Sequence, residues 1–146
     1  MSETKQYATF WADGLLFGVE VTRVQEVIRY QTMTAVPLAN EVVAGLINLR
    51  GQIVTALDLR TRLALAPRAA GVNPMNVIIR TDDGAVSLLV DEIGDVIDVP
   101  VVNWERAPAT LEAGARDLIT GAFKLKDRLL LVLDADRATD TPAVAA

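Results

Sequence analysis

The stretch that decides the fold is residues 45–59, which read G-L-I-N-L-R-G-Q-I-V-T-A-L-D-L. It consists of two apolar runs of strand length, 46–49 and 53–59, which are separated by Arg50 and Gly51. Glycine readily adopts the positive φ that a tight chain reversal requires. The pattern therefore predicts a β-hairpin whose tip is Arg50-Gly51.

The same pattern occurs again further along the chain. Residues 121–135 read G-A-F-K-L-K-D-R-L-L-L-V-L-D-A, and they align without a gap with residues 45–59, at numbers that are higher by 121 − 45 = 76. The matched pairs are Gly45 with Gly121, Leu49 with Leu125, Arg50 with Lys126, Ile53 with Leu129, Leu57 with Leu133 and Asp58 with Asp134.

A second match lies upstream of each hairpin. Asp13-Gly14 and Asp83-Gly84 each separate two apolar runs, and similar pentamers follow at 24–28 (V-Q-E-V-I) and 93–97 (I-G-D-V-I). Each half thus reads strand, Asp-Gly turn, strand, short Val/Ile segment and Gly-led hairpin. Because a duplication explains the order of all these features, the sequence predicts two related β units.

Composition limits both the fold and the chemistry. The chain has 146 residues, 51% of them hydrophobic, which suits one domain with a sizeable core. It has no cysteine and no histidine, which excludes disulfides and thiolate metal sites and removes the commonest metal ligand and catalytic base. The net charge of −5 and the lack of a Lys/Arg cluster argue against nucleic acid as a partner. No signal peptide and no apolar run of about 20 residues is present, so we expect a soluble, cytoplasmic protein without membrane insertion.

Periodicity predicts the remaining elements. Residues 21–29 carry Val21, Val24, Val27 and Ile28 at roughly helical spacing, which favours a short amphipathic helix over a strand. Strands are expected at 7–12, 15–20, 76–81, 85–90, 93–99, 118–125 and 129–133, short helices at 61–65 and 134–140, connections at 34–40 and 66–74, a surface loop at 104–116, and a frayed tail after residue 140.

Catalysis is poorly supported by the residues present. The two serines are Ser2, at the terminus, and Ser87, inside an apolar strand, so nucleophilic catalysis has no evident candidate. The acidic pairs Asp82-Asp83, Asp91-Glu92 and Asp134/Asp136 fall at turns and strand ends, where carboxylates commonly serve solubility and local hydrogen bonding. No Gly-rich phosphate loop occurs. The sequence predicts a protein that is not an enzyme and that holds no cofactor or metal.

Asn48 and Arg50 give the positive signal. A polar Asn48 within an apolar strand requires hydrogen-bond partners and can tie down the turn. Arg50 at the tip would present a guanidinium that is suited to a partner's carboxylate or backbone carbonyls. It fits equally well as a solvated turn arginine.

With these residues the sequence resembles a known family. The pattern G-x-I-N-L-R-G-x-I-V-x-x-x-D-L-R, preceded by V-Q-E-V-I and V-P, is similar to the CheW-type coupling proteins of bacterial chemotaxis. The matching residues are 24–28, Val36, Pro37, Gly45, 47–51, 53–54 and 58–60. The similarity extends from the strand at 7–10 to the closing Leu-Asp, and so covers nearly the whole chain.

The resemblance implies a fold. We expect a mainly β protein with two SH3-like five-stranded β-barrel subdomains packed together and a few short helices. The single CheW-like domain would cover 1–146, with subdomain 1 at about 12–66 and subdomain 2 at about 75–134. The N- and C-terminal segments would complete the barrels.

The resemblance also implies a function. Such proteins are non-enzymatic adaptors that join the cytoplasmic tips of chemoreceptors to a CheA-type histidine kinase in membrane-associated, ring-like arrays. A groove between the barrels takes the receptor's helical hairpin. By motif, Arg50, Asn48 and Gly51 fall on the receptor side, Val24 and Glu26 fall on a partner-binding segment, and Gly45 belongs to the same set.

Two departures leave the pathway open. The family often has Pro where this chain has Thr55, and a second Pro near Asn40. Flagellar chemotaxis, a related chemosensory pathway, and a regulatory module of a larger kinase- or receiver-containing protein all remain compatible. A small-ligand-binding or weakly catalytic barrel is the alternative from another class, and it would show a concave pocket with converging polar groups. An adaptor would show an exposed apolar patch rimmed by Arg50 and Glu26.

Overall fold

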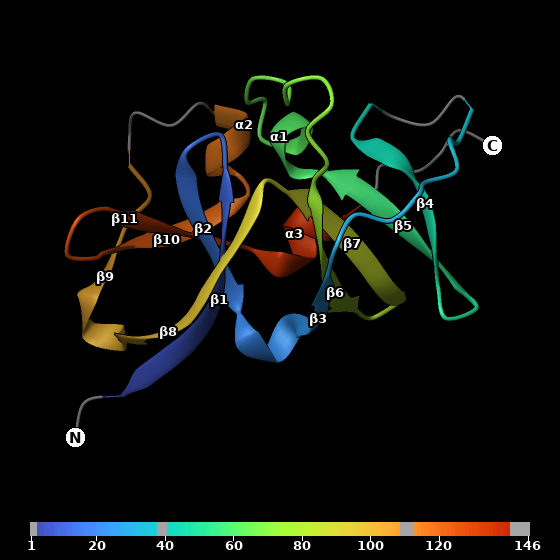
Figure 1. The fold of residues 1–146 in the computed structure, drawn as a ribbon. Helices are drawn as coiled ribbons and strands as arrows, with labels where there is room; N and C mark the ends of the chain where they lie inside the picture. The colour runs from blue at the N-terminus through green and yellow to red at the C-terminus, as the bar shows by residue number, and fades with distance from the viewer. Residues whose placement is uncertain (1–2, 38–40, 109–112, 141–146) are drawn as a thin grey trace.

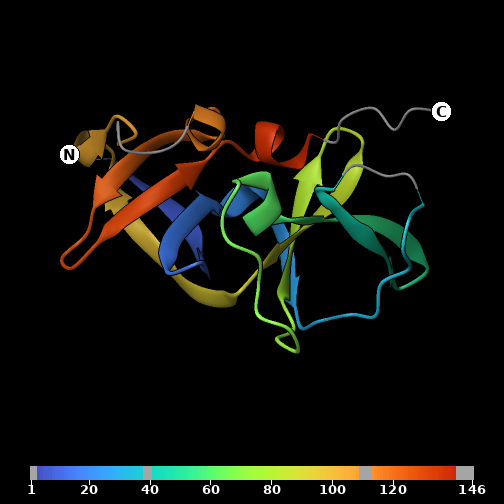
Figure 2. The ribbon, with the colours of Figure 1, turned by 90° about the horizontal axis from the view of Figure 1, so that it is seen from above.

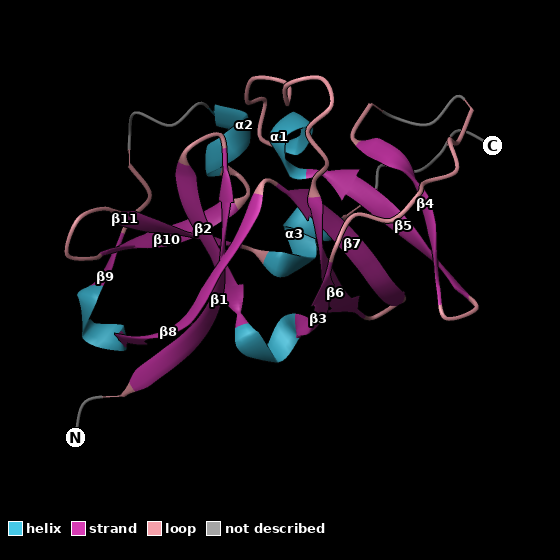
Figure 3. Cartoon of the chain, in the orientation of Figure 1, coloured by secondary structure: helices cyan, strands magenta, loops and turns pink. Residues whose placement is uncertain are grey.

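The computed structural model describes residues 3–37, 41–108 and 113–140, most of which lie in β-strands (Figures 1 and 3). The strands are β1 (Thr4–Ala12), β2 (Leu15–Glu20), β3 (Val24–Ile28), β4 (Val43–Leu49), β5 (Gln52–Asp58), β6 (Met75–Thr81), β7 (Gly84–Val90), β8 (Glu92–Pro100), β9 (Trp104–Glu105), β10 (Ile119–Lys124) and β11 (Leu129–Leu133). The helices are α1 (Leu59–Arg62), α2 (Ala113–Arg116) and α3 (Ala135–Thr139), with 3-10 turns η1 (Val21–Arg23) and η2 (Val101–Asn103).

The strands form two sheets. Sheet 1 has the order β8-β1-β2-β11-β10-β9 and sheet 2 has the order β3-β6-β7-β5-β4. Seen from above, the two sheets lie side by side, and α1 and α3 lie near their junction (Figure 2). The predicted mainly β fold, with two packed barrel subdomains and a few short helices, is confirmed. No helix within the described residues is long and apolar enough to cross a membrane.

The two halves of the sequence exchange strands. The β1–β2 hairpin of the first half pairs with β8 and β11 of the second, and the β6–β7 hairpin pairs with β3 and β5 of the first. In each sheet one of these contacts is parallel, β11 with β2 and β5 with β7. The strand pairing therefore differs from the predicted halves 12–66 and 75–134. The physical reason is that a sequence repeat specifies which edges are complementary, but not whether the complementary edge belongs to the same half.

The duplication is visible in the register. Phe10 pairs with Phe17 in sheet 1, and Ile79 pairs with Val86 in sheet 2, each residue number being higher by 69. The β4–β5 and β10–β11 hairpins both shift register just before a glycine, between Val43 and Gly45 and between Ile119 and Gly121. The sheets are thus two copies of one five-strand unit, and sheet 1 adds the two-residue β9.

The short helices after β5 and β11 begin for the same reason. The Asp58 carboxylate accepts a hydrogen bond from Arg60 N, and the Asp134 carboxylate accepts from Asp136 N and Arg137 N. A side-chain acceptor at this position satisfies the amides that a first helical turn leaves free. The helix predicted at 134–140 is confirmed, and the one predicted at 61–65 begins earlier, at Leu59, because Asp58 is the cap.

One predicted helix is wrong. Residues 21–29 form η1 and then β3, which pairs antiparallel with β6. In β3 half-buried Val24, Glu26 and Ile28 alternate with exposed Gln25 and Val27, which is a strand period. Five residues are too few for periodicity to separate strand from helix, and β-branched residues beside a free sheet edge favour the strand.

The loop predicted at 104–116 contains β9 and α2. Parts of three predicted segments, namely 38–40, 109–112 and the tail 141–146, lie outside the described residues.

Buried side chains form three clusters. The largest lies between the sheets and includes Phe10, Phe17, Leu57, Leu88 and Leu118. The sheet 1 cluster contains Tyr7, Leu16, Val99, Phe123, Leu130 and Val132, and the sheet 2 cluster contains Ile47, Leu49, Val54 and Ile78. Each fully buried side chain of this size contributes about 1.5–3 kcal/mol. The central cluster is therefore the main reason that the two sheets form one unit.

Candidate binding surface at the β4–β5 hairpin

The hairpin predicted from the sequence ends in a two-residue turn. Leu49 pairs with Gln52, and between them Arg50 has φ 51° and Gly51 has φ 87°. Two consecutive positive φ angles are typical of the type I′ turn, whose twist matches that of the strands. The Asn48 Oδ1 accepts a hydrogen bond from Gly51 N at 2.8 Å. Asn48 therefore fixes the turn from which the Arg50 side chain projects.

An ion pair joins this tip to the other edge of sheet 2. The Arg50 guanidinium donates a hydrogen bond to Glu26 Oε2, although β3 and β4 are the two edge strands of the sheet. The Arg50 hydrogen bond holds the pKa of the Glu26 carboxyl below its usual value. The Arg50 side chain is 69% exposed and that of Glu26 is 24% exposed. The pair is thus accessible from outside while it bridges the open side of the barrel.

Apolar side chains are exposed near the pair. Ile53 is directly opposite Asn48 in the register, so both residues are on one face of the hairpin, and Ile53 is 62% exposed. Val27 follows Glu26 in β3 and is 45% exposed, but alternation places it on the other face of that strand. The polar tip is therefore flanked by apolar area on the hairpin face.

Two of the predicted site residues lie in the framework below the surface. Gly45 is buried, and a Cβ there would lie 2.9 Å from the carbonyl oxygen of Thr34. Thr34 and Leu46 exchange two backbone hydrogen bonds of 2.8 Å, so Gly45 allows the 29–37 segment to cross β4. Val24 packs against the central cluster. The structure thus brings together Arg50, Asn48, Gly51 and Glu26, and leaves Gly45 and Val24 supporting them.

A cluster of charged side chains at the junction of the two sheets was not predicted. The Asp91 carboxylate binds Arg60 at 2.6 Å and Arg68 at 3.1 Å. Arg68 also binds Asp58 at 3.3 Å, and Arg60 lies 3.5 Å from Asp13 in the β1–β2 turn. The arginine side chains are only 15% and 10% exposed, so we assign this cluster a structural role.

The pKa of Asp91 reflects this surrounding. Burial raises it, but hydrogen bonds from Arg60, from the Asp13 amide and from Arg68 outweigh burial and hold it below its usual value. The motif Asp58-Leu59-Arg60 already contains two of the charged residues of this cluster. Their partner Asp91 is distant in the chain, so the sequence alone does not reveal the contact. Within the described residues no group of acidic side chains is arranged to hold a metal ion.

Comparison with known proteins gives a consistent result. The CheW-like domain family matches residues 6–142. The chain is 33% identical over 131 residues to the chemotaxis protein CheW of Bacillus subtilis, covering 90% of this chain and 84% of that protein. It is 26% identical over 129 residues to the chemotaxis protein CheW of Klebsiella aerogenes, covering 88% and 78%.

A solved structure agrees as well. The crystal structure of the scaffolding protein TtCheW from Thermoanaerobacter tengcongensis superposes with a TM-score of 0.80 at 25% sequence identity, and the match covers 90% of each chain. The match along almost the whole sequence and the shared fold show that this chain belongs to the CheW family.

Proposed function

We propose that this protein is a non-enzymatic adaptor that couples the cytoplasmic tips of chemoreceptors to a CheA-type histidine kinase in chemotaxis signalling. Family membership supports the proposal, since the relatives are named as chemotaxis proteins and one as a scaffolding protein. The observation that carries it is the Arg50-Gly51 turn, which holds a guanidinium at the open side of a barrel.

The tip suits a helical partner. A guanidinium has five N–H donors, and within the described residues Arg50 uses one nitrogen, for Glu26. The others remain available for carboxylates or terminal carbonyls on a receptor helix. Exposed Ile53 adds apolar area on the adjoining face. A helix that lies against an apolar surface with a few polar anchors is a common recognition mode, and it requires no reactive group.

An adaptor also needs a second surface for its second partner. At the far end of sheet 1 a hollow of about 420 Å³ is lined by Trp11, Leu15, Arg128 and Leu129, among others. Leu15 is 36% exposed and Leu129 is 38% exposed, and the Arg128 guanidinium lies 4.7 Å from the centre of the Trp11 ring. We assign this surface to the kinase, in ring-like arrays beneath the membrane, because it lies on the other barrel from Arg50.

The test is a pair of binding assays followed by a kinase assay. The purified protein is mixed with the host's CheA-type kinase and with a receptor cytoplasmic fragment, separately and together, and kinase autophosphorylation is measured. We expect receptor-dependent stimulation. Arg50→Ala should lose receptor binding and keep kinase binding, whereas Leu129→Glu should do the reverse.

Lys126→Ala is the matched control, because Lys126 occupies the tip of the equivalent hairpin in sheet 1. It should retain receptor binding. Failure of the parent protein to bind either partner would contradict the adaptor function. Equal loss of both partners in Arg50→Ala, with the fold intact by circular dichroism, would contradict the assignment of two separate surfaces.

A further inference from the structure

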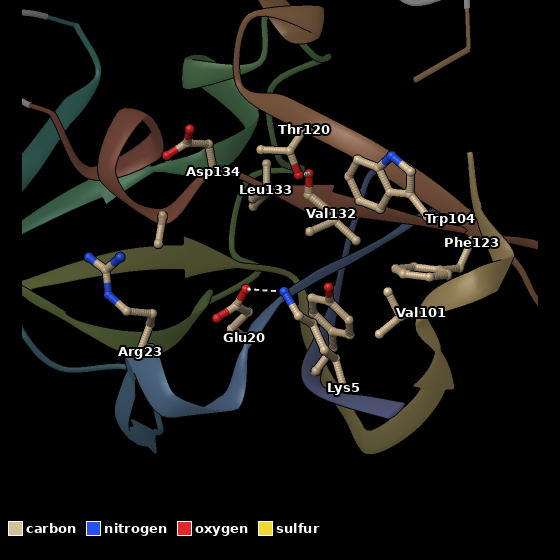
Figure 4. Close-up of a pocket in the computed structure, with 12 residues that line it drawn as sticks. Lys5, Glu20, Arg23, Val101, Trp104, Thr120, Phe123, Val132, Leu133 and Asp134 are labelled. Carbon is tan, nitrogen blue, oxygen red and sulfur yellow. Dashed lines mark hydrogen bonds and ion pairs between the residues drawn. The ribbon is translucent and has the colours of Figure 1, made fainter. Parts of the chain in front are cut away.

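One end of sheet 1 encloses a cavity of about 370 Å³ that the adaptor function does not use (Figure 4). Figure 4 shows Trp104 and Phe123 on one side and the paired Lys5 and Glu20 across from Val132. The lining comes from β1, β2, β9, β10 and β11 and from the segments that follow β2, β8 and β11. Its volume is within the range of sites for small ligands, roughly 300–1,000 Å³.

Three aromatic rings form its wall. The rings of Tyr7 and Phe123 lie 5.6 Å apart between centres at 50°, and those of Trp104 and Phe123 lie 5.6 Å apart at 72°. Phe123 is buried, whereas Trp104 is 43% exposed. Tilted and edge-on arrangements leave ring faces and edges available to a further aromatic group. The wall is therefore suited to a flat, apolar ligand.

The wall also carries one hydroxyl group, that of Tyr7. Most of the Tyr7 side chain is buried, but its hydroxyl oxygen remains accessible and makes no hydrogen bond with any residue of 3–37, 41–108 or 113–140. A phenolic hydroxyl can both donate and accept a hydrogen bond. Burial raises the pKa of Tyr7, the nearby Lys5 charge lowers it and the Glu20 charge raises it. The hydroxyl is thus protonated at neutral pH and free to bond a ligand.

The equivalent polar side chain in sheet 2 is hydrogen-bonded within the protein. Asn76 occupies the position of Tyr7, since Tyr7 pairs with Ile97 and Asn76 pairs with Ile28, again 69 residues apart. The Ser87 hydroxyl donates to Asn76 Oδ1 at 2.7 Å, and Asn76 Nδ2 donates to the carbonyl of Arg29 at 3.1 Å. Gly18 replaces Ser87 in sheet 1 and offers no hydroxyl to Tyr7. Among these two equivalent positions, a polar group without a hydrogen bond to the described residues therefore occurs only in sheet 1.

The charges at the mouth of the cavity are already paired. Lys5 Nζ lies 3.3 Å from Glu20, Arg23 lies 2.6 Å from Asp136, and Asp134 caps α3. A charged ligand would have to compete with these pairs, whereas an uncharged one would not. The mouth therefore favours a neutral ligand.

We propose that this cavity binds a small uncharged aromatic molecule of the phenol class. The ring lies against Phe123 and Trp104, and the ligand's hydroxyl bonds the Tyr7 hydroxyl. This ligand site does not depend on the proposed coupling of receptor and kinase, and its test does not depend on the outcome of the coupling assays.

The probe is 4-fluorophenol, followed by fluorine NMR and by fluorescence of Trp104 in a Trp11→Phe background, which leaves Trp104 as the single tryptophan. We expect saturable binding that changes both signals. Tyr7→Phe should weaken binding about five-fold, because it removes one hydrogen bond and keeps the ring. Tyr30→Phe is the matched control, since the chain has two tyrosines and Tyr30 does not line the cavity. It should bind like the parent.

Two further arms complete the test. Fluorobenzene, which lacks the hydroxyl, should bind more weakly and should not distinguish Tyr7→Phe from the parent. Val101→Trp should abolish binding by filling the cavity. Binding that does not saturate, or equal affinity for 4-fluorophenol in the parent and in Tyr7→Phe, would overturn the proposal. So would undiminished binding to a folded Val101→Trp variant.

Discussion

Each repeat ends in a hairpin and a short helix, β4–β5–α1 in the first and β10–β11–α3 in the second. The two share their backbone arrangement and differ in the side chains at the hairpin tip. Both carry a buried glycine at the register shift and an aspartate that caps the following helix. Their tips differ, because Arg50 and Gly51 both have positive φ, whereas within the described residues the matching Lys126 and Asp127 do not. The comparison teaches that the repeat conserves the backbone and leaves the tips free to diverge.

The residue two positions after each cap shows the same divergence. Arg60 and Asp136 are equivalent, 76 residues apart, and have opposite charge. Arg60 enters the cluster around Asp91, where it is 15% exposed, while Asp136 binds Arg23 with its side chain 74% exposed. Equivalent positions have therefore been used for a buried contact in one unit and a surface contact in the other.

The largest effect should come from breaking the buried cluster. Asp91→Ala leaves Arg60 and Arg68 without their shared carboxylate in a mostly buried place, so we expect a loss of about 3 kcal/mol in the free energy of unfolding. Asp136→Ala, the equivalent break at the exposed pair, should cost far less. Urea denaturation of both variants measures the difference. Equal losses would contradict the structural role of the cluster.

The same cluster predicts a pH dependence. The pKa of Asp91 is lower in the folded protein than its ordinary value of 3.8, so its stabilisation is fully present above that value. It is lost as the pH falls through the folded pKa. Stability of the parent should therefore drop in acid below about pH 4, and Asp91→Ala should show a shallower drop. Parallel curves for parent and variant would show that other groups cause the acid loss.

The two buried glycines should respond differently to alanine. At Gly45 the new methyl group would meet the carbonyl oxygen of Thr34, which two backbone hydrogen bonds hold in place. At Gly121 it would overlap the Trp104 ring, which is 43% exposed and able to move outward. We expect Gly45→Ala to cost about 2 kcal/mol and Gly121→Ala less. Thermal melts compare them, and a larger loss for Gly121→Ala would show that the Trp104 ring is fixed.

The turn itself can be tested at Gly51. A Cβ at this position meets no atom within 4 Å, but its φ of 87° is strained for any residue with a side chain. Gly51→Val should therefore cost about 1 kcal/mol or more. Gln52→Val, the neighbour in ordinary strand conformation, serves as the control. A Gly51→Val variant that melts like the parent would contradict the tight-turn geometry.

The hairpins, the caps and the duplication could be predicted, because each depends on residues close together in the chain. Gly45, Arg50-Gly51 and Asp58 specify a local geometry, and their counterparts 76 residues later repeat it. The exchange of hairpins between the halves could not be predicted. The two repeats have similar strand edges, so the sequence does not determine whether a hairpin pairs with strands of its own half or of the other half. The strand at Val24–Ile28 was missed because its five residues also fit helical spacing.

The candidate site was predictable only in part. The motif drew attention to Asn48, Arg50, Gly51 and Glu26, but their proximity depends on the curvature of sheet 2, which brings its two edges together. The aromatic wall of the sheet 1 cavity depends on Tyr7, Trp104 and Phe123 at once. Contacts of this kind join separate segments of the chain, so they cannot be predicted from a local sequence pattern.

The smallest effect on stability should come from the tips. Arg50→Ala removes an exposed ion pair, so the denaturation midpoint should change little, as it should for Lys126→Ala. Only Arg50→Ala should alter Glu26, whose carboxyl pKa is held low by the Arg50 hydrogen bond and should rise towards its ordinary value of 4.5. An NMR titration of the Glu26 side chain measures this. If the pKa of Glu26 stays low in Arg50→Ala, another group holds the carboxylate, and the tip would not be coupled to β3. If the pKa rises in Arg50→Ala and not in Lys126→Ala, the two hairpins differ in the ion pair that holds Arg50, the side chain that we propose binds the receptor.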